Sequence, residues 1–298
     1  MKKYALSFIV SFLLTLGVVA QNKIVVLQTD FGLKDGAVSE MKGVAMGVSP
    51  ELKLFDLTHE IPAYNIWEAS YRLYQTINYW PKGTVFVSVV DPGVGTSRKS
   101  VVLKTNTGQY IVTPDNGTLT HVAETYGIAE IRQIDEAVNR RKGSGKSYTF
   151  HGRDVYVYTA ARLAAGIISY EQVGPALPRQ VVIIPYQKAV FENGMLKGTI
   201  DVLDVQYGNI WTDISDELVK KLSPKYGDLL HLKIFNKSKM VYEGEAPYSE
   251  TFGSVPQGKP LSYLNSLLQL SFALNMGSFA DTYKIGSGSN WSVEVTRK

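Results

Sequence analysis

The stretch Val89-Val90-Asp91-Pro92-Gly93-Val94-Gly95-Thr96-Ser97-Arg98 carries an apolar run into a cluster of turn residues. The apolar run, residues 84–90, is rich in β-branched side chains and follows Pro81-Lys82-Gly83, which predicts a buried strand. The Asp-Pro-Gly turn must leave the sheet. Asp91 is therefore expected at the carboxyl end of a strand, where ligands of α/β sheets bind. Taken alone, Asp91 and Arg98 are more simply explained as a turn aspartate and a surface arginine.

Length and composition set the broad class. The chain has 298 residues, of which 45% are hydrophobic and 19% charged, a globular composition long enough for about two domains. The formal charge is +4, and the basic residues are scattered rather than clustered, so nothing indicates nucleic-acid binding. The absence of cysteine excludes disulfides and a lipid anchor attached through cysteine.

The first 20 residues have the pattern of an export signal. Met1-Lys2-Lys3 is basic, residues 4–19 are apolar, and Val18-Val19-Ala20 is a plausible cleavage site before Gln21. We expect residues 1–20 to be a cleaved signal peptide and the mature protein to be periplasmic or extracellular. A retained N-terminal anchor is the alternative.

The pattern beyond the leader predicts two domains. Strands are expected at residues 22–28, 52–57, 84–90, 101–103 and 110–112, and helices at Ala37–Val48 and Ile66–Ile77. This alternation predicts an α/β N-terminal domain, residues 21–180, with a largely parallel sheet. After Gly174-Pro175-Ala176-Leu177-Pro178, short alternating runs predict a C-terminal, mostly antiparallel β domain, residues 181–298.

Three further places carry side chains suited to a site. Asp30 follows the first strand, again a carboxylate at a strand end. His151 precedes a predicted helix, where unpaired backbone N–H groups would meet a ligand; a packed or capping histidine is the alternative. Asp204, Tyr207 and Asn209 flank Gly208 and together suit a polar, partly aromatic ligand, although a simple hairpin turn explains them as well. Four scattered histidines without cysteine do not predict a metal site.

Several short motifs, in this order, resemble one family. They are Thr29-Asp30-Phe31-Gly32, Met41-Lys42-Gly43, Thr58-His59-Glu60-Ile61-Pro62, Val90-Asp91-Pro92-Gly93-Val94-Gly95-Thr96, Pro114-Asp115-Asn116-Gly117, Phe150-His151-Gly152-Arg153-Asp154 and Tyr207-Gly208-Asn209. The chain resembles the S-adenosyl-L-methionine (SAM) hydroxide adenosyltransferases, or SAM hydrolases, which are relatives of the fluorinating and chlorinating SAM-dependent halogenases. The match covers nearly all of residues 22–285.

The resemblance implies a reaction and a set of roles. Activated water would attack the ribose C5′ of SAM to give adenosine and L-methionine, with SAM as substrate and no cofactor or metal. The catalytic triad falls on Asp91, Arg98 and His151. Substrate-binding roles fall on Asp30 for the ribose hydroxyls, Asp204 for the ammonium, Asn209 for adenine, Tyr64, Tyr207 and Phe252 as aromatic walls, and Ser266 at one end of the substrate.

The resemblance also implies an assembly and an epimer. The fold would pair the α/β domain with a β-barrel-like domain. The protein would be a homotrimer with sites at subunit interfaces, and it would prefer the (R)-sulfonium epimer.

Two alternatives remain. A halogenase typically carries Tyr in place of Asp91, Thr in place of Val94, and Tyr-Ser in place of His151-Gly152. Because a carboxylate repels a halide, these residues favour water as the nucleophile. The predicted export raises the second alternative, an exported adenosine- or SAM-binding protein with little turnover, since SAM is mainly cytosolic.

Overall fold

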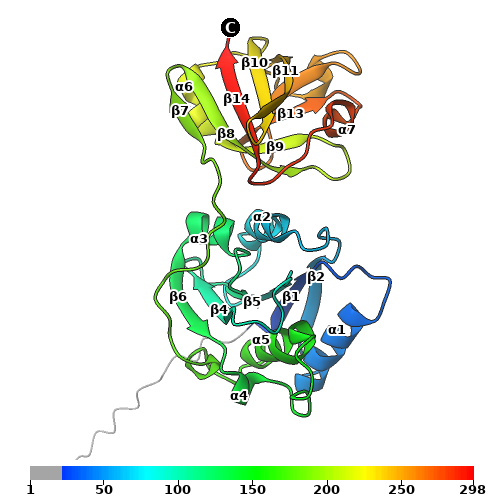
Figure 1. The fold of residues 1–298 in the computed structure, drawn as a ribbon, viewed down its shortest axis with the longest axis vertical. Helices are drawn as coiled ribbons and strands as arrows, with labels where there is room; N and C mark the ends of the chain where they lie inside the picture. Colours follow the sequence, from blue (N-terminus) through cyan, green and yellow to red (C-terminus); the bar gives the residue numbers. More distant parts are fainter. Residues whose placement is uncertain (1–21) are drawn as a thin grey trace, which may run out of the picture.

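The computed structural model describes residues 22–298, and the predicted signal peptide lies outside the described residues. The chain forms two lobes joined by a linker that runs past α3 (Thr120–Tyr126), as Figure 1 shows. Among residues 22–298, none of the helices has the length and hydropathy needed to cross a membrane.

The N-terminal lobe is built on a six-stranded sheet in the order β2-β1-β3-β5-β4-β6. Its strands are β1 (Ile24–Thr29), β2 (Lys53–Thr58), β3 (Val85–Val89), β4 (Ser100–Thr105), β5 (Tyr110–Pro114) and β6 (Ile128–Gln133). Neighbours from β2 through β5 run parallel, whereas β4 is antiparallel to both β5 and β6. The predicted α/β fold with a largely parallel sheet is confirmed, and β6 is the strand that the sequence pattern missed.

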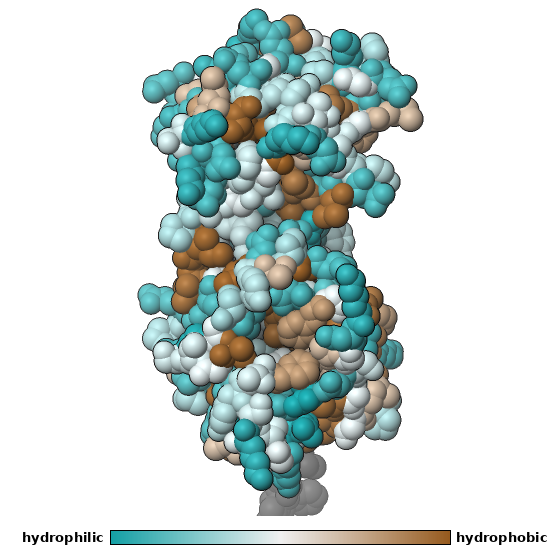
Figure 2. Space-filling view, turned by 45° about the vertical axis from the view of Figure 1, so that its right-hand side comes forward, coloured by the Kyte–Doolittle hydropathy of each residue, from teal (hydrophilic) through white to brown (hydrophobic). Residues whose placement is uncertain are grey.

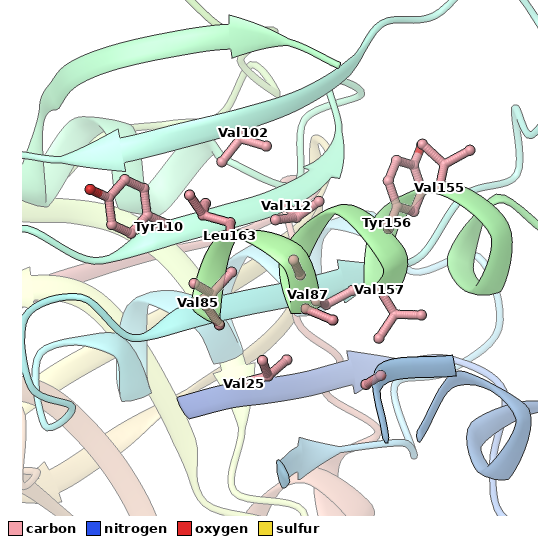
Figure 3. Packing of buried hydrophobic residues seen from close by; sticks show 14 of the residues in the cluster. Val25, Val85, Val87, Val102, Tyr110, Val112, Val155, Tyr156, Val157 and Leu163 are labelled. Atoms are coloured by element: carbon pink, nitrogen blue, oxygen red, sulfur yellow. The ribbon is translucent and has the colours of Figure 1, made fainter. Parts of the chain in front are cut away.

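Helices cover both faces of this sheet because both faces are apolar. On one face, α1 (Ala37–Val48) and α5 (Val157–Ala164) pack on the valine-rich strands; Figure 3 shows α5 lying over β3 and β5. On the other face lie α2 (Ile66–Ile77) and α3. The bounds of α1 and α2 are those predicted from sequence. The short helix α4 (Glu136–Asn139) follows β6.

The C-terminal lobe is an antiparallel sheet that curls around its own core. Its main path is β11-β10-β14-β8-β9-β13-β12, with β7 (Val190–Glu192) paired to β8. The other strands are β8 (Met195–Leu203), β9 (Ile210–Ser215), β10 (Leu229–Asn236), β11 (Lys239–Pro247), β12 (Pro260–Leu264), β13 (Gln269–Leu274) and β14 (Trp291–Arg297). A bridge between Tyr248 and Ser262 links the two ends of the path, so the sheet is nearly barrel-shaped, as expected.

Two helices complete this lobe. α6 (Asp216–Leu222) follows β9 and packs on the apolar core of the barrel, and α7 (Phe279–Tyr283) follows β13. The core contains the large side chains Phe272 and Phe279 and the aliphatic side chains of β8, β10 and β14.

Hydrogen bonds from α2 hold the two lobes together. The Trp67 indole Nε1 donates to the Asp201 carbonyl at 2.7 Å, and Arg72 Nη2 donates to the Leu203 carbonyl at 3.1 Å. The Tyr71 hydroxyl donates to Gln269 Oε1 at 3.2 Å. These bonds satisfy buried polar groups, so separating the lobes would leave them unpaired.

Asp213 lies near Asp201, which contacts α2, and it makes the stability of the folded protein depend on pH. Thr199 N donates to its Oδ1 at 2.7 Å, while burial and the neighbouring Asp201 raise the pKa of Asp213 to about 8. Because the folded protein holds this proton more tightly than the unfolded chain does, the stabilisation is present at low pH. It is lost as the pH rises through about 8, at no more than ~1.4 kcal/mol per pH unit.

Asp213→Asn keeps an oxygen acceptor for Thr199 and removes the titration. We expect its melting temperature to fall less than that of the wild type between about pH 6 and about pH 9. Circular dichroism melts across that range test this expectation. Asp228→Asn, at a partly exposed ion pair with Arg297, serves as the control. Parallel curves for Asp213→Asn and the wild type would contradict the expectation.

Candidate active site

Asp91 and Arg98 form a two-pronged ion pair between β3 and β4. Arg98 Nε donates to Asp91 Oδ1 at 2.9 Å and Nη2 donates to Oδ2 at 2.5 Å. The two side chains are only 4% and 11% exposed, so this pair is neither a turn aspartate nor a surface arginine. The Asp-Pro-Gly-Val-Gly loop turns twice between them, through Val94 N to Asp91 O and Thr96 N to Gly93 O. Charge-assisted, bidentate pairs of this kind fix geometry well.

Tyr156 and Ser100 make further hydrogen bonds to the Asp91–Arg98 pair. The Tyr156 hydroxyl donates to Asp91 Oδ2 at 3.4 Å, and Arg98 Nη1 donates to Ser100 Oγ at 3.2 Å. The guanidinium lies 5.8 Å from the centre of the Tyr156 ring. Burial and the Asp91 charge raise the pKa of Tyr156, so its hydroxyl stays a donor. Sequence reasoning missed both residues.

His151 lies at the start of a π-helical turn, η1 (Gly152–Tyr156), that leads into α5. It is 4% exposed. A Cβ on Gly152 would lie 3.3 Å from Val89 Cγ1, so a glycine here lets the turn approach the end of β3 closely. Burial lowers the pKa of His151, opposed by Glu136. The imidazole is therefore neutral at neutral pH.

Four predicted site residues meet in one cavity of about 240 Å³: Asp30, Tyr64, Asp91 and His151. The other lining residues are Phe31, Ala63, Val89, Val94, Thr149, Phe150 and Gly152. Asp30 Oδ2 accepts the Tyr64 N–H at 2.9 Å, and Tyr64 has a left-handed backbone with φ of 67°. Such strain in a non-glycine residue is typical of functional sites. Arg98 does not line this cavity itself, but it is paired with Asp91, which does.

The remaining predicted residues line a second cavity of about 820 Å³ in the C-terminal lobe. They are Asp204, Tyr207, Asn209, Phe252 and Ser266. The tight turn at Gly208 arranges the first three, because Gly208 N donates to Asp204 O at 2.7 Å and Asn209 Nδ2 donates to Asp204 Oδ2 at 3.2 Å.

No alternative side chain fits easily at the centre of that turn. Gly208 has φ of 68°, and a Cβ there would lie 1.9 Å from Ser278 Oγ. Trp211, another lining residue, has an indole N–H that is buried and has no partner within residues 22–298. Sequence reasoning missed Trp211 as well, although it follows Asn209 by only two residues.

The two cavities have no lining residue in common. The first, at about 240 Å³, is also smaller than the usual ~300–1,000 Å³ of a small-molecule site. A separate groove of about 740 Å³ along α2 adjoins the second cavity through Asp204 and Trp211. Figure 2 shows apolar surface near the waist between the lobes. One chain thus places the candidates of the C-terminal lobe apart from the cavity that holds Asp30, Tyr64, Asp91 and His151.

Comparison with known proteins gives this arrangement a family. Residues 25–174 match the SAM hydroxide adenosyltransferase N-terminal domain, and residues 198–292 match the corresponding C-terminal domain. The chain belongs to the SAM hydroxide adenosyltransferase family. The first match contains Asp91, Arg98 and His151, and the second contains Asp204 and Asn209.

Relatives within the SAM hydroxide adenosyltransferase family have two kinds of name. An (R)-S-adenosyl-L-methionine hydrolase from Methanocaldococcus jannaschii is 38% identical over 72% of this chain and 74% of its own length. A hydrolase of the same name from Salinispora tropica is 34% identical over 89% and 95%. A fluorinase from Actinopolyspora mzabensis is 29% identical over 92% and 97%.

Solved structures agree with the fold. The crystal structure of an uncharacterised conserved protein from Thermotoga maritima superposes with a TM-score of 0.83 at 37% identity, covering 92% of this chain and all of the other.

Proposed function

We propose that this protein hydrolyses SAM to adenosine and L-methionine. The observation that carries the proposal is the buried Asp91–Arg98 pair, of which Asp91 lines the same small cavity as His151, in a chain whose relatives are named (R)-SAM hydrolase. Selectivity for the (R)-sulfonium epimer is part of the proposal, because the same relatives have that epimer in their names.

In the proposed reaction, water attacks C5′ of the ribose in line with the sulfonium. The new C5′–O bond forms as the C5′–S bond breaks, and the electron pair of that bond neutralises the sulfur, releasing methionine. The fixed charge of Arg98 stabilises the developing hydroxide. Asp91 accepts from Arg98 through both oxygens and from Tyr156 through Oδ2, which leaves a lone pair on Oδ1 with which to align the water or accept its proton.

The carboxylate of Asp91 also separates this proposal from halogenation. A halide would have to lose its water beside a negative charge, which is unfavourable in a buried site. The Asp91 side chain is 4% exposed, so water screens that repulsion little. We therefore expect no halogenated adenosine when fluoride or chloride is added.

The substrate-binding roles and the assembly belong to the same proposal. Asp30 would hold the ribose hydroxyls, Asp204 the ammonium and Asn209 the adenine, with Tyr64, Tyr207, Phe252 and Ser266 around them. The separation of the two cavities supports a homotrimer in which one subunit's first cavity faces a neighbour's second cavity. Tyr64 and Tyr207 are 72% and 66% exposed, which suits surfaces that meet another subunit.

The proposed setting is outside the cytoplasm, supported by the leader sequence, and the proposed reaction needs no cofactor and no metal. An exported SAM hydrolase would act on SAM that has left the cell.

The decisive experiment incubates the purified protein with SAM of mixed sulfonium configuration and follows products by chromatography. We expect adenosine and methionine in equal amounts and residual SAM of the (S) configuration. Intact SAM with tightly bound adenosine would instead support an adenosine- or SAM-binding protein with little turnover. A halogenated nucleoside would support the halogenase alternative.

A further inference from the structure

The two ring nitrogens of His151 have different surroundings. Nε2 lies 3.3 Å from Arg140 Nη2, within hydrogen-bonding distance. Nδ1 is buried and has no partner among the described residues. A guanidinium is always charged and can only donate, so the nitrogen that faces it must carry a lone pair.

Arg140 is itself held in place. Its Nη2 and Nε donate to Glu136 Oε2 at 2.5 Å and 3.2 Å, one helical turn earlier, and its guanidinium lies 4.5 Å from the centre of the Tyr148 ring. The side chain is only 10% exposed. An arginine fixed on two sides presents its N–H to His151 in one direction.

Burial, rather than the surrounding charges, favours a neutral ring at His151. Arg98 and Arg140 are positive, Asp91 and Glu136 are negative, and the uncharged rings of Tyr148 and Tyr156 lie 6.2 Å and 6.3 Å away. Glu136 Oε1 is 3.7 Å from Nε2, too far for a good hydrogen bond. A protonated His151 would point an N–H at the N–H of Arg140, which is the less favourable arrangement.

We propose that Arg140 is a positioning residue that holds His151 as the Nδ1–H tautomer, so that neither ring nitrogen of His151 is left to act as a base. The consequence rests on the proposed function: within the triad, Asp91 is left to accept the proton of the water.

The tautomer can be measured without any assay of activity. Long-range ¹H–¹⁵N correlation spectra of the imidazoles distinguish Nδ1–H from Nε2–H, and the chain has four histidines to assign, with His151 identified by its loss in His151→Gln. We expect the Nδ1–H form in the wild type and a growing Nε2–H population in Arg140→Met. An Nε2–H or doubly protonated His151 in the wild type at neutral pH overturns the proposal.

Kinetics give a second readout. Arg140→Met should lower kcat about 10- to 100-fold with a smaller change in KM, as for other residues that orient a functional histidine. Removing the positive charge should also raise the pKa of His151, which is measured by following the ¹⁵N shifts of its ring with pH. Arg140→Lys, which keeps a charged donor, should recover part of the rate.

Arg132→Met is the matched control, because Arg132 likewise pairs with a glutamate, Glu130, and lies over a tyrosine ring, Tyr170, away from His151. It should leave the tautomer of His151 unchanged. If Arg140→Met fails to fold, Glu136→Gln loosens the arginine and should also increase the Nε2–H population of His151. An unchanged Nδ1–H population in the folded variant overturns the proposal. A wild type that leaves SAM intact defeats the proposed function, while the spectra still decide the tautomer.

Discussion

Asp91→Asn is expected to lower the rate of SAM hydrolysis by about 10²- to 10⁴-fold, the range for loss of a positioned acid–base group. The amide keeps the shape of the side chain but has one acceptor oxygen where the carboxylate has two. It therefore cannot accept from both Nε and Nη2 of Arg98 while still holding a water. The measurement is single-turnover release of adenosine, which separates chemistry from product release.

Asp228→Asn is the control for this variant, since it also replaces a carboxylate paired with an arginine, Arg297, but at the far end of the C-terminal lobe. It should retain wild-type rates. Arg98→Ala and the double variant test whether the pair acts as a unit: the combined loss should be much smaller than the product of the single losses. Retention of more than about a tenth of the rate by Asp91→Asn would remove Asp91 from the chemistry.

The sequence predicted those parts of the fold in which periodicity and burial agree. The α2 segment alternates apolar and polar residues at helical spacing, and its bounds follow from that pattern and from the Asn65 cap. Strand β3 is buried at every position and reads as a continuous apolar run. In contrast, β6 is an edge strand of mixed polarity, and α3 has only seven residues, so neither leaves a clear periodic signal.

The site was predictable where its residues lie in short motifs at strand ends, and less so where contacts are tertiary. Asp91 and Arg98 share one loop, and the sequence placed them together. Tyr156 and Arg140 reach the same centre from other segments, and nothing local marks them as partners. The one available signal for Arg140 was Glu136 four residues earlier, a helical ion-pair spacing that also occurs on many surfaces.

The placement of the two cavities leads to a test of the proposed assembly. Asp91→Asn disables the first cavity and Asp204→Asn removes the charge of the second. Asp204→Asn should lower kcat/KM roughly 10²-fold or more by removing the partner of the substrate ammonium. Each variant alone is then nearly inactive at low SAM concentration, but the two substituted residues lie on different lobes.

When the two variants are co-expressed with different tags and purified through both, mixed trimers should recover activity. In a cyclic assembly, a neighbouring pair can contribute one intact first cavity and one intact second cavity, and every mixed trimer has one such pair, so about a third of its sites are complete. A site contained within one chain would recover nothing, because every chain has one defect.

Mixing Asp91→Asn with His151→Gln is the matched control, because both changes lie in the first cavity and no pairing of those subunits restores it. Recovery in the first mixture and none in the second would place the active site between subunits. The separation of the two cavities within one chain would then be the reason that the protein must assemble in order to act.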